Sequence, residues 1–244
     1  MSNSYFQFKQ FTVQQDRCAM KVTTDGCLFG AWAGSEIRSP KSEARGVLDV
    51  GAGTGLLSLM LAQKNTDLNI TAIEIDKDAF QQATENIAAS PWTDRIKIFH
   101  ADARSYSFPH QYDVIISNPP FYEHELKADD KKKNVAHHGD ELSLTELLSI
   151  IKNNLSPSGS FFLLLPFKRN EEIKNLLVEN DLSVSNMLFV KQSVQHGYFR
   201  IMLTGKLKAS ESNETVIDEI AIRDDQQQYT SSFKDLLKDY YLHL

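Results

Sequence analysis

Residues 47–56 read VLDVGAGTGL, an apolar run that ends in three closely spaced glycines. The apolar run is typical of a buried parallel strand, and residues 56–63 continue with the apolar pattern of a helix. Gly51, Gly53 and Gly55 allow a sharp turn and let the backbone approach a ligand with no Cβ in the way. The unit therefore predicts a ligand site at the helix N-terminus, where free N–H groups are exposed.

The spacing of the glycines indicates which ligand this turn accepts. A dinucleotide-binding turn reads G-x-G-x-x-G and directs the helix dipole at a pyrophosphate. Here the pattern is G-x-G-x-G, and Asp49 precedes the first glycine by two residues. A carboxylate there repels a pyrophosphate but suits the ammonium end of a methionine moiety. The turn resembles the first cofactor motif of the class I S-adenosylmethionine-dependent methyltransferases, which makes Asp49 and the three glycines cofactor-binding candidates.

Acidic residues follow the next two expected strands. Glu74 ends the apolar run 70–75, where a strand-end carboxylate accepts hydrogen bonds from ribose hydroxyls. Asp76 lies one step into the next turn and is expected to cap the following helix instead. After a short strand at 96–99, Asp102 occupies the place where, by the same resemblance, an acid accepts from the adenine amine of the cofactor.

Residues 118–121 read NPPF and follow the apolar run 112–117. The Asn118 amide offers an acceptor and two donors, and the Pro119 carbonyl adds a second acceptor. The two prolines fix φ, so these acceptors are held in place, and Phe121 supplies a flat face for stacking. The turn resembles the active-site motif of methyltransferases that modify amines attached to planar systems.

That resemblance assigns roles within the turn. Asn118, Pro119 and Phe121 are the catalytic candidates, and Asn118 also borders the cofactor. Pro120 and Tyr122 are substrate-binding candidates, with Tyr122 either extending the stacking platform or lying at its rim. No metal is needed, because a sulfonium methyl group is already a strong electrophile.

Strands alternate with helical segments through the middle of the chain, which favours a parallel sheet with helices on both faces. Two later β-rich runs, at 184–190 and 198–206, are expected to pair as antiparallel strands. The methyltransferase resemblance implies a Rossmann-like, mostly parallel sheet of seven strands with one reversed. The expected organisation is an N-terminal extension over the cofactor and substrate site at 1–34, a methyltransferase domain at 35–208 and an acidic C-terminal extension at 209–244.

The N-terminal segment narrows the resemblance. The runs FKQFTV (8–13) and KVTTDGCLFGAWA (21–33), taken with NPPF, are similar to bacterial tRNA(adenine-N6)-methyltransferases that act on the valine tRNA. This similarity implies methylation of the adenine 3′ of the anticodon, at position 37, and the anticodon arm of tRNA as the partner. It also places Lys21 and Asp25 over the cofactor, where a lysine can pair with the methionine carboxylate.

The overall charge of the chain argues against an RNA substrate, since the formal net charge is −6 and the isoelectric point is near 5.7. Residues 209–244 hold eight acidic and three basic residues, so most of the excess lies in this tail. Lys191 and Arg200 lie in the acid-free stretch 191–208 and are candidate phosphate contacts at the rim of the cofactor face. Lys131 and Lys132 are further candidates. Acidic residues adjoin them, however, so a solvated loop that does not bind RNA explains this stretch equally well.

Composition limits the cellular location and the kinds of cysteine site that are expected. No run of about 18 apolar residues and no apolar signal-peptide core is present, so the protein is expected in the cytoplasm and away from membranes. Cys18 and Cys27 show neither the spacing of a zinc site nor that of a disulfide framework. The oligomeric state is left open. The tail is either a strand at 216–222 with a closing helix at 233–242, or a weakly ordered end.

Two other functions remain after these arguments. An Asn-Pro-Pro-aromatic turn also serves methyltransferases acting on a protein glutamine amide or on a guanine amine of ribosomal RNA. Outside the enzymes, a cofactor-binding RNA protein without turnover is possible, although intact Asn118 and an intact glycine turn argue against it. Fold alone does not choose among these functions.

Overall fold

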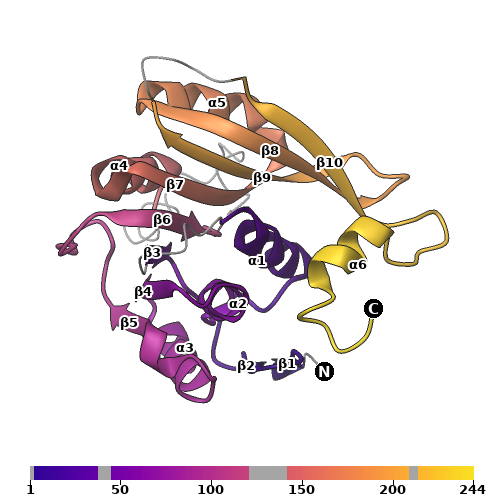
Figure 1. The fold of residues 1–244 in the computed structure, drawn as a ribbon, viewed down its shortest axis with the longest axis horizontal. Coiled ribbons are helices and arrows are strands. Elements are labelled where there is room, and N and C mark those ends of the chain that lie inside the picture. The colour runs from indigo at the N-terminus through magenta and orange to yellow at the C-terminus, as the bar shows by residue number, and fades with distance from the viewer. Residues whose placement is uncertain (1–2, 38–44, 121–141, 209–213) are drawn as a thin grey trace, which may run out of the picture.

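The computed structural model describes residues 3–37, 45–120, 142–208 and 214–244. Its centre is a mostly parallel sheet with helices on both faces (Figure 1). In spatial order, its strands are β10 (Val216–Arg223), β8 (Leu182–Ser193), β9 (Tyr198–Leu207), β7 (Leu155–Pro166), β6 (Tyr112–Ser117), β3 (Arg45–Val50), β4 (Leu68–Glu74) and β5 (Ile96–His100). Strand β9 runs antiparallel to both of its neighbours, and the other adjacent pairs are parallel.

The sheet confirms the expected fold class and corrects its strand count. The seven expected strands are present with one reversed, and the pairing of β8 with β9 is the antiparallel pair that the sequence indicates. Strand β10 adds an eighth strand beside β8. It lies within the expected C-terminal extension, so the β-extension is the correct one of the two alternatives for that segment.

The helices begin where local sequence signals place them. Asp76 caps α3, its Oδ1 accepting from the Ala79 backbone N–H at 2.8 Å, as the sequence predicts. Ser143 and Glu146 form a reciprocal capping box at the start of α4. The helices are α1 (Thr24–Glu36), α2 (Leu56–Lys64), α3 (Lys77–Ala88), α4 (Leu144–Asn154), α5 (Asn170–Glu179) and α6 (Ser231–Leu237), with short 3₁₀ turns at Thr93–Arg95 and Phe167–Arg169.

Two hydrophobic clusters cover the two faces of the sheet. Because successive strand residues point to opposite faces, Val47 packs with α1, α2 and α6, whereas Leu48 packs with α4 and α5. Ile115 and Ile116 divide in the same way on β6. The central strands are therefore apolar on both sides, which explains why they read as continuous hydrophobic runs.

A small hairpin of β1 (Tyr5–Gln7) and β2 (Thr12–Gln14) packs beside the C-terminal segment (Figure 1). Phe8 forms an isolated β-bridge with Tyr241, and the Lys9 backbone N–H donates to the Tyr240 carbonyl at 2.8 Å. The Tyr240 hydroxyl in turn donates to the Met60 carbonyl on α2. The two ends of the chain thus pack together on the α1–α2 face.

The carboxyl ends of β3, β4 and β6 meet at one edge of the sheet, which is where α/β sheets bind ligands. Among the helices that the structure describes, none has the length and apolar character required to cross a membrane.

Candidate active site

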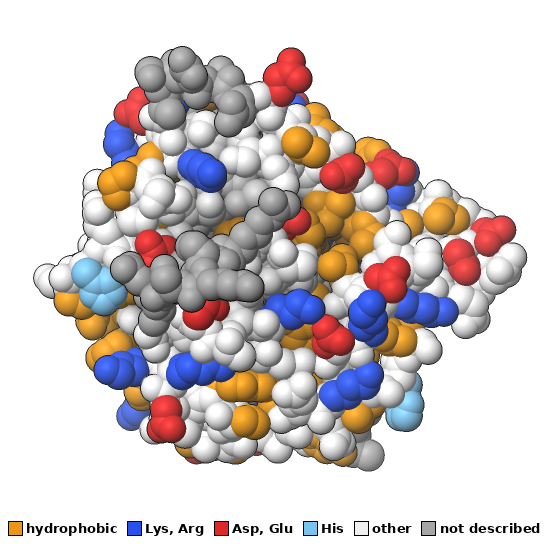
Figure 2. Space-filling view, viewed as in Figure 1, with side chains coloured by type: hydrophobic (Ala, Val, Ile, Leu, Met, Phe, Trp, Pro, Cys, Tyr) orange, Lys and Arg blue, Asp and Glu red, His pale blue; other side chains and the backbone are white. Residues whose placement is uncertain are grey.

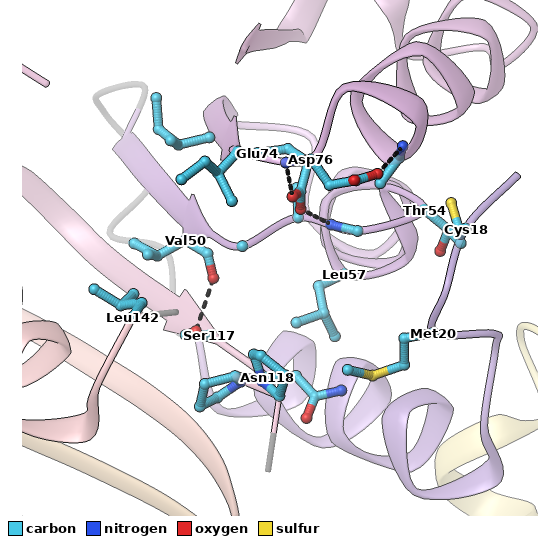
Figure 3. A pocket seen from close by; sticks show the side chains of 18 of the residues that line it. Cys18, Met20, Val50, Thr54, Leu57, Glu74, Asp76, Ser117, Asn118 and Leu142 are labelled. Carbon is cyan, nitrogen blue, oxygen red and sulfur yellow. Dashed lines mark hydrogen bonds between the residues drawn. The ribbon is translucent and has the colours of Figure 1, made fainter. Parts of the chain in front are cut away.

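A cavity of about 280 Å³ opens at the carboxyl ends of β3, β4 and β6 (Figure 3). Five separate segments contribute most of its lining, at 18–23, 50–54, 73–76, 101–104 and 117–120. Each segment contains a residue or motif that the sequence singles out. Expected site residues far apart in the chain are therefore brought to one place.

The glycine turn forms one wall of the cavity. Gly51, Gly53 and Gly55 all have positive φ, at 74°, 55° and 80°, a region that other residues rarely adopt. A Cβ built on Gly51 or Gly53 would meet nothing within 4 Å, so both backbones face open space. Gly55 differs, because it lies outside the lining and a Cβ there would be 3.5 Å from that of Ala83. Gly55 therefore serves the packing of α2 on α3 rather than the cavity.

Glu74 holds the glycine turn in position. Its Oε2 accepts from the Gly53 backbone N–H at 2.7 Å, and its Oε1 accepts from the Asp76 backbone N–H at 2.8 Å (Figure 3). The side chain is 7% exposed and lines the cavity. Both carboxylate oxygens retain lone pairs beyond these bonds, so Glu74 can also accept from ligand hydroxyls.

Asp49 lies behind the cavity wall rather than on it. The residue is fully buried, and the Ser58 hydroxyl donates to its Oδ2 at 2.7 Å. Within the described part of the chain, its Oδ1 has no hydrogen-bond partner. Burial raises the pKa of the Asp49 carboxyl to about 6. Val50 and Gly51 line the cavity in front of it, so the direct ligand contact that the sequence suggests for Asp49 is not visible in this geometry.

Asp102 lines the cavity in partnership with Arg104. The Arg104 Nε donates to both carboxylate oxygens of Asp102 at 2.9 Å, and Arg104 Nη2 lies 2.7 Å from Oδ2. Hydrogen bonding from Arg104 lowers the pKa of the Asp102 carboxyl, so this residue is a fixed anion. Arg104 also lines the cavity, yet the sequence analysis does not select it, because a basic residue two positions after an acid carries no distinct signal.

The Asn-Pro-Pro turn closes the opposite side of the cavity. The buried Ser117 donates its hydroxyl hydrogen to the Val50 carbonyl at 2.7 Å, which ties the end of β6 to the end of β3 (Figure 3). Asn118, Pro119 and Pro120 follow directly and line the cavity. The turn and the glycine wall are thus held at a fixed separation by a buried hydrogen bond.

Residues 18–23 form a roof that the N-terminal hairpin positions. Three amide side chains anchor it, and none of them was selected from the sequence. Asn86 on α3 bonds both backbone groups of Gln14 and also donates to the Thr54 carbonyl in the glycine turn, each at 2.9 Å. Gln82 and Gln15 accept from the backbone N–H groups of Arg17 and Val22.

The roof brings Lys21 to the cavity, where it is one of the lining residues. Cys18 also lines the cavity, and burial raises the pKa of its thiol to about 11, so it remains neutral. Both cysteines are free and buried. Within the described ranges, no cluster of three or more His, Cys, Asp or Glu side chains suits a metal ion.

Asp25 lies outside the cavity lining, on the far side of the first turn of α1. Its Oδ2 accepts from Arg200 Nε at 2.7 Å, so the two residues selected separately for cofactor and RNA form one ion pair. Lys191 is likewise paired, with Glu219 at 3.1 Å. The remaining selected residues, Phe121, Tyr122, Lys131 and Lys132, lie outside the described residues.

Comparisons with known proteins agree with this geometry. Residues 36–176 match the family model described as "Methyltransferase small domain". The chain is 41% identical over 241 residues to a tRNA1(Val) (adenine(37)-N6)-methyltransferase of Dyadobacter fermentans, covering 98% of each chain. It is 40% identical to the protein of the same name from Bacteroides thetaiotaomicron, covering 100% of each chain.

A solved structure supports the fold independently. The crystal structure of a predicted O-methyltransferase from Agrobacterium tumefaciens superposes with a TM-score of 0.61 at 14% identity, covering 88% of this chain and 96% of that one. At this identity, the match bears on the fold alone. Taken with the full-length relatives and the family model, these findings show that the chain belongs to the tRNA1(Val) (adenine(37)-N6)-methyltransferase family, within the wider methyltransferase small domain group.

Proposed function

We propose that this protein transfers a methyl group from S-adenosylmethionine to the exocyclic N6 amine of adenine 37 in the valine tRNA. The observation that carries the proposal is that Asn118, Pro119 and the glycine turn line one cavity. Relatives about 40% identical over nearly the whole chain bear the name of that activity. Because the proposed substrate is a tRNA, we place the protein in the cytoplasm.

The residues of the cavity fit the proposed cofactor. The Gly51 and Gly53 backbones face open space that a bound group can fill. Glu74 offers carboxylate lone pairs for ribose hydroxyls, and Asp102 offers them for an adenine amine. Lys21 on the roof provides a cation for the methionine carboxylate. Asp49 places a buried carboxylate behind the glycine turn, with one oxygen that has no partner among the described residues, where it can favour a nearby ammonium group through charge.

When bound, S-adenosylmethionine supplies an electrophilic methyl group on its sulfonium. The protein's task is to align the amine and exclude water. The amine of adenine is a poor nucleophile, because its lone pair is delocalised into the ring. The Asn118 Oδ1 and the Pro119 carbonyl each accept one of its N–H groups, which favours a pyramidal nitrogen. The same two acceptors stabilise the positive charge that develops on that nitrogen.

The substrate side of the proposal extends beyond the described residues. Phe121 stacks on the target base, with Pro120 and Tyr122 extending the platform, and the base leaves the anticodon-loop stack to reach it. Lys131 and Lys132 follow this platform and contact phosphates, as do Lys191 and Arg200 once they exchange their carboxylate partners.

The methyl acceptor is the first point to test. Purified protein and labelled cofactor are incubated with total RNA, and separately with total protein, from a strain that lacks the gene. We expect label in tRNA at adenine 37 of the valine isoacceptor. Label only in protein would support the glutamine-amide alternative, label in ribosomal RNA the guanine-amine alternative, and no label at all a binding protein without turnover.

The catalytic turn is tested by Asn118→Ala. We expect turnover to fall by about 100-fold or more, the scale on which removal of one preorganised polar group acts. Cofactor affinity, measured by calorimetry, should change far less. Asn180→Ala, the same truncation at the end of α5 and outside the cavity, is the matched control. Activity of Asn118→Ala within a few-fold of wild type would remove Asn118 from the mechanism.

A further inference from the structure

A second hollow, of about 410 Å³, lies on the other side of the first turn of α1. We call it the β8–β10 groove, because its walls are the β8–β9 turn, the start of β9 and the β10–α6 connection. Its volume falls in the range of about 300–1,000 Å³ that is usual for small-ligand sites. Asn118 and Pro119, the two residues selected as catalytic that the structure describes, do not line it.

The groove adjoins the proposed active site along the same edge of the sheet. Pro166 at the carboxyl end of β7 is in register with Arg200 at the start of β9, so both hollows open at the carboxyl edge of the parallel strands. Thr23 and Gly26 line the cofactor cavity, whereas Thr24 and Asp25 line the groove. The width of a helix, about 10–12 Å with its side chains, therefore separates them.

The walls of the groove are fixed by hydrogen bonds. The Val194 backbone N–H in the β8–β9 turn donates to the Arg223 carbonyl at 3.0 Å, which joins this turn to the end of β10. The Thr230 hydroxyl donates to the Ala221 carbonyl and holds the β10–α6 connection against β10. A groove that is built before its ligand arrives loses less entropy on binding.

The chemistry of the lining suits a planar heterocycle. Phe199 and Tyr229 present aromatic rings, and Arg223 lies 4.5 Å from the centre of the Tyr229 ring. Gln192 and Gln227 add amides, which offer both donors and acceptors to a base edge. Single-stranded RNA is recognised through this combination of aromatic faces, arginine planes and polar edges.

The charge of the lining does not oppose RNA. Among the described residues that line it, the one carboxylate is that of Asp25, which is paired with Arg200, and Arg223 adds a positive charge. Elsewhere on the face in Figure 2, Lys and Arg side chains are interspersed with Asp and Glu rather than gathered in one basic patch. With a net charge of −6, phosphate attraction alone supplies little affinity, which increases the need for contacts to bases.

We propose that the β8–β10 groove binds an unstacked base of the substrate RNA, from a nucleotide near the adenine that enters the cofactor cavity. The inference rests on the proposed tRNA substrate and adds a second base-binding site to it. Phe199 provides the stacking face and Gln192 reads the edge of the base. The groove then holds the anticodon loop open while the target adenine is methylated.

The stacking role is tested by two variants of one residue. Phe199→Leu keeps apolar bulk but removes the flat face, whereas Phe199→Tyr keeps that face. We expect Phe199→Leu to raise the KM for tRNA by about tenfold or more, the scale of one base–aromatic contact, and Phe199→Tyr to remain within about twofold of wild type. Cofactor affinity should be unchanged in both. Val194→Ala, in the adjacent β8–β9 turn but outside the lining, is the control.

The nucleotide whose base enters the groove is identified with a set of anticodon stem-loop RNAs, each of which carries an abasic nucleotide at a different loop position. One abasic position should weaken binding to wild type but add nothing in Phe199→Leu, because both changes remove the same contact. Equal tRNA KM values for Phe199→Leu and wild type would overturn the inference and leave the proposed function standing. If no tRNA is methylated at all, the proposed function fails. The groove is then judged by stem-loop binding alone: loss of binding in Phe199→Leu would support it, and unchanged binding would overturn it.

Discussion

Because the carboxyl of Asp49 is buried, we predict that its ionisation lowers the stability of the folded protein by a measurable amount. Burial raises its pKa to about 6 in the folded protein, whereas the unfolded value is near 3.8. Well below pH 3.8 the group is neutral in both states and carries no penalty. As the pH rises, the unfolded chain ionises first, so the carboxyl destabilises the fold increasingly up to about pH 6 and by a constant amount above it.

The size of the effect follows from the shift. About two pKa units correspond to roughly 3 kcal/mol of lost stability above pH 7. Roughly half of that loss develops between pH 5 and pH 7.5, because the folded group titrates inside this window. Asp49→Asn has nearly the same shape but does not ionise. The unfolding free energy of the variant, relative to wild type, should therefore increase by roughly 1 to 2 kcal/mol between pH 5 and pH 7.5.

Urea denaturation of both proteins without cofactor, at four or five pH values, measures this difference directly. Other titrating groups cancel, because they are common to the two proteins. The value at pH 5 contains the cost of burying an amide, and only the slope with pH reports the charge. A stability difference that stays constant across the window would refute the buried-charge reasoning. Cofactor calorimetry on the same samples shows whether the ionised form of Asp49 aids binding.

Three further predictions concern other residues. Glu74→Ala should weaken cofactor binding by about 1.5–3 kcal/mol, through loss of charged hydrogen bonds to ribose and of the bond that holds Gly53. Unchanged affinity, measured by calorimetry, would mean that the ribose contact lies elsewhere. Lys191→Ala and Arg200→Ala should each flatten the salt dependence of tRNA binding by up to about one unit of slope, whereas slopes equal to wild type in a salt series would mean that these residues stay on Glu219 and Asp25. Gly205→Ala should destabilise the fold by about 1–3 kcal/mol in urea denaturation, because its Cβ would lie 2.5 Å from Phe161 Cζ in a fully buried part of the sheet. Stability equal to that of wild type would show that β9 can shift.

The features that the sequence predicts well are those with local signals. The glycine turn, the capping role of Asp76 and the Asn-Pro-Pro turn each depend on residues within a few positions of one another. The mostly parallel character of the sheet also follows, because apolar runs separated by helices favour parallel strands. Glu74 could be placed at the cavity because a strand of known direction ends there.

The features that the sequence does not predict are pairings between distant residues. Asn86 bonds Gln14 across 72 positions, and Arg200 bonds Asp25 across 175 positions. Periodicity shows which face of an element a side chain occupies, but not which partner that face meets. Strand β10 gave a weak signal for a related reason. It lies at the edge of the sheet, where half of its residues are exposed and its apolar pattern is incomplete.

The contact between the two ends of the chain bears on the order of events during synthesis. The hairpin that supports the roof residues 18–23 is made long before one of its docking surfaces, around Tyr240 and Tyr241. Until then the hairpin lacks the bond from Lys9 to Tyr240 and the packing of Phe8 on Tyr241. Assembly of the roof over the cofactor cavity therefore depends on two segments that are more than 200 residues apart in the sequence.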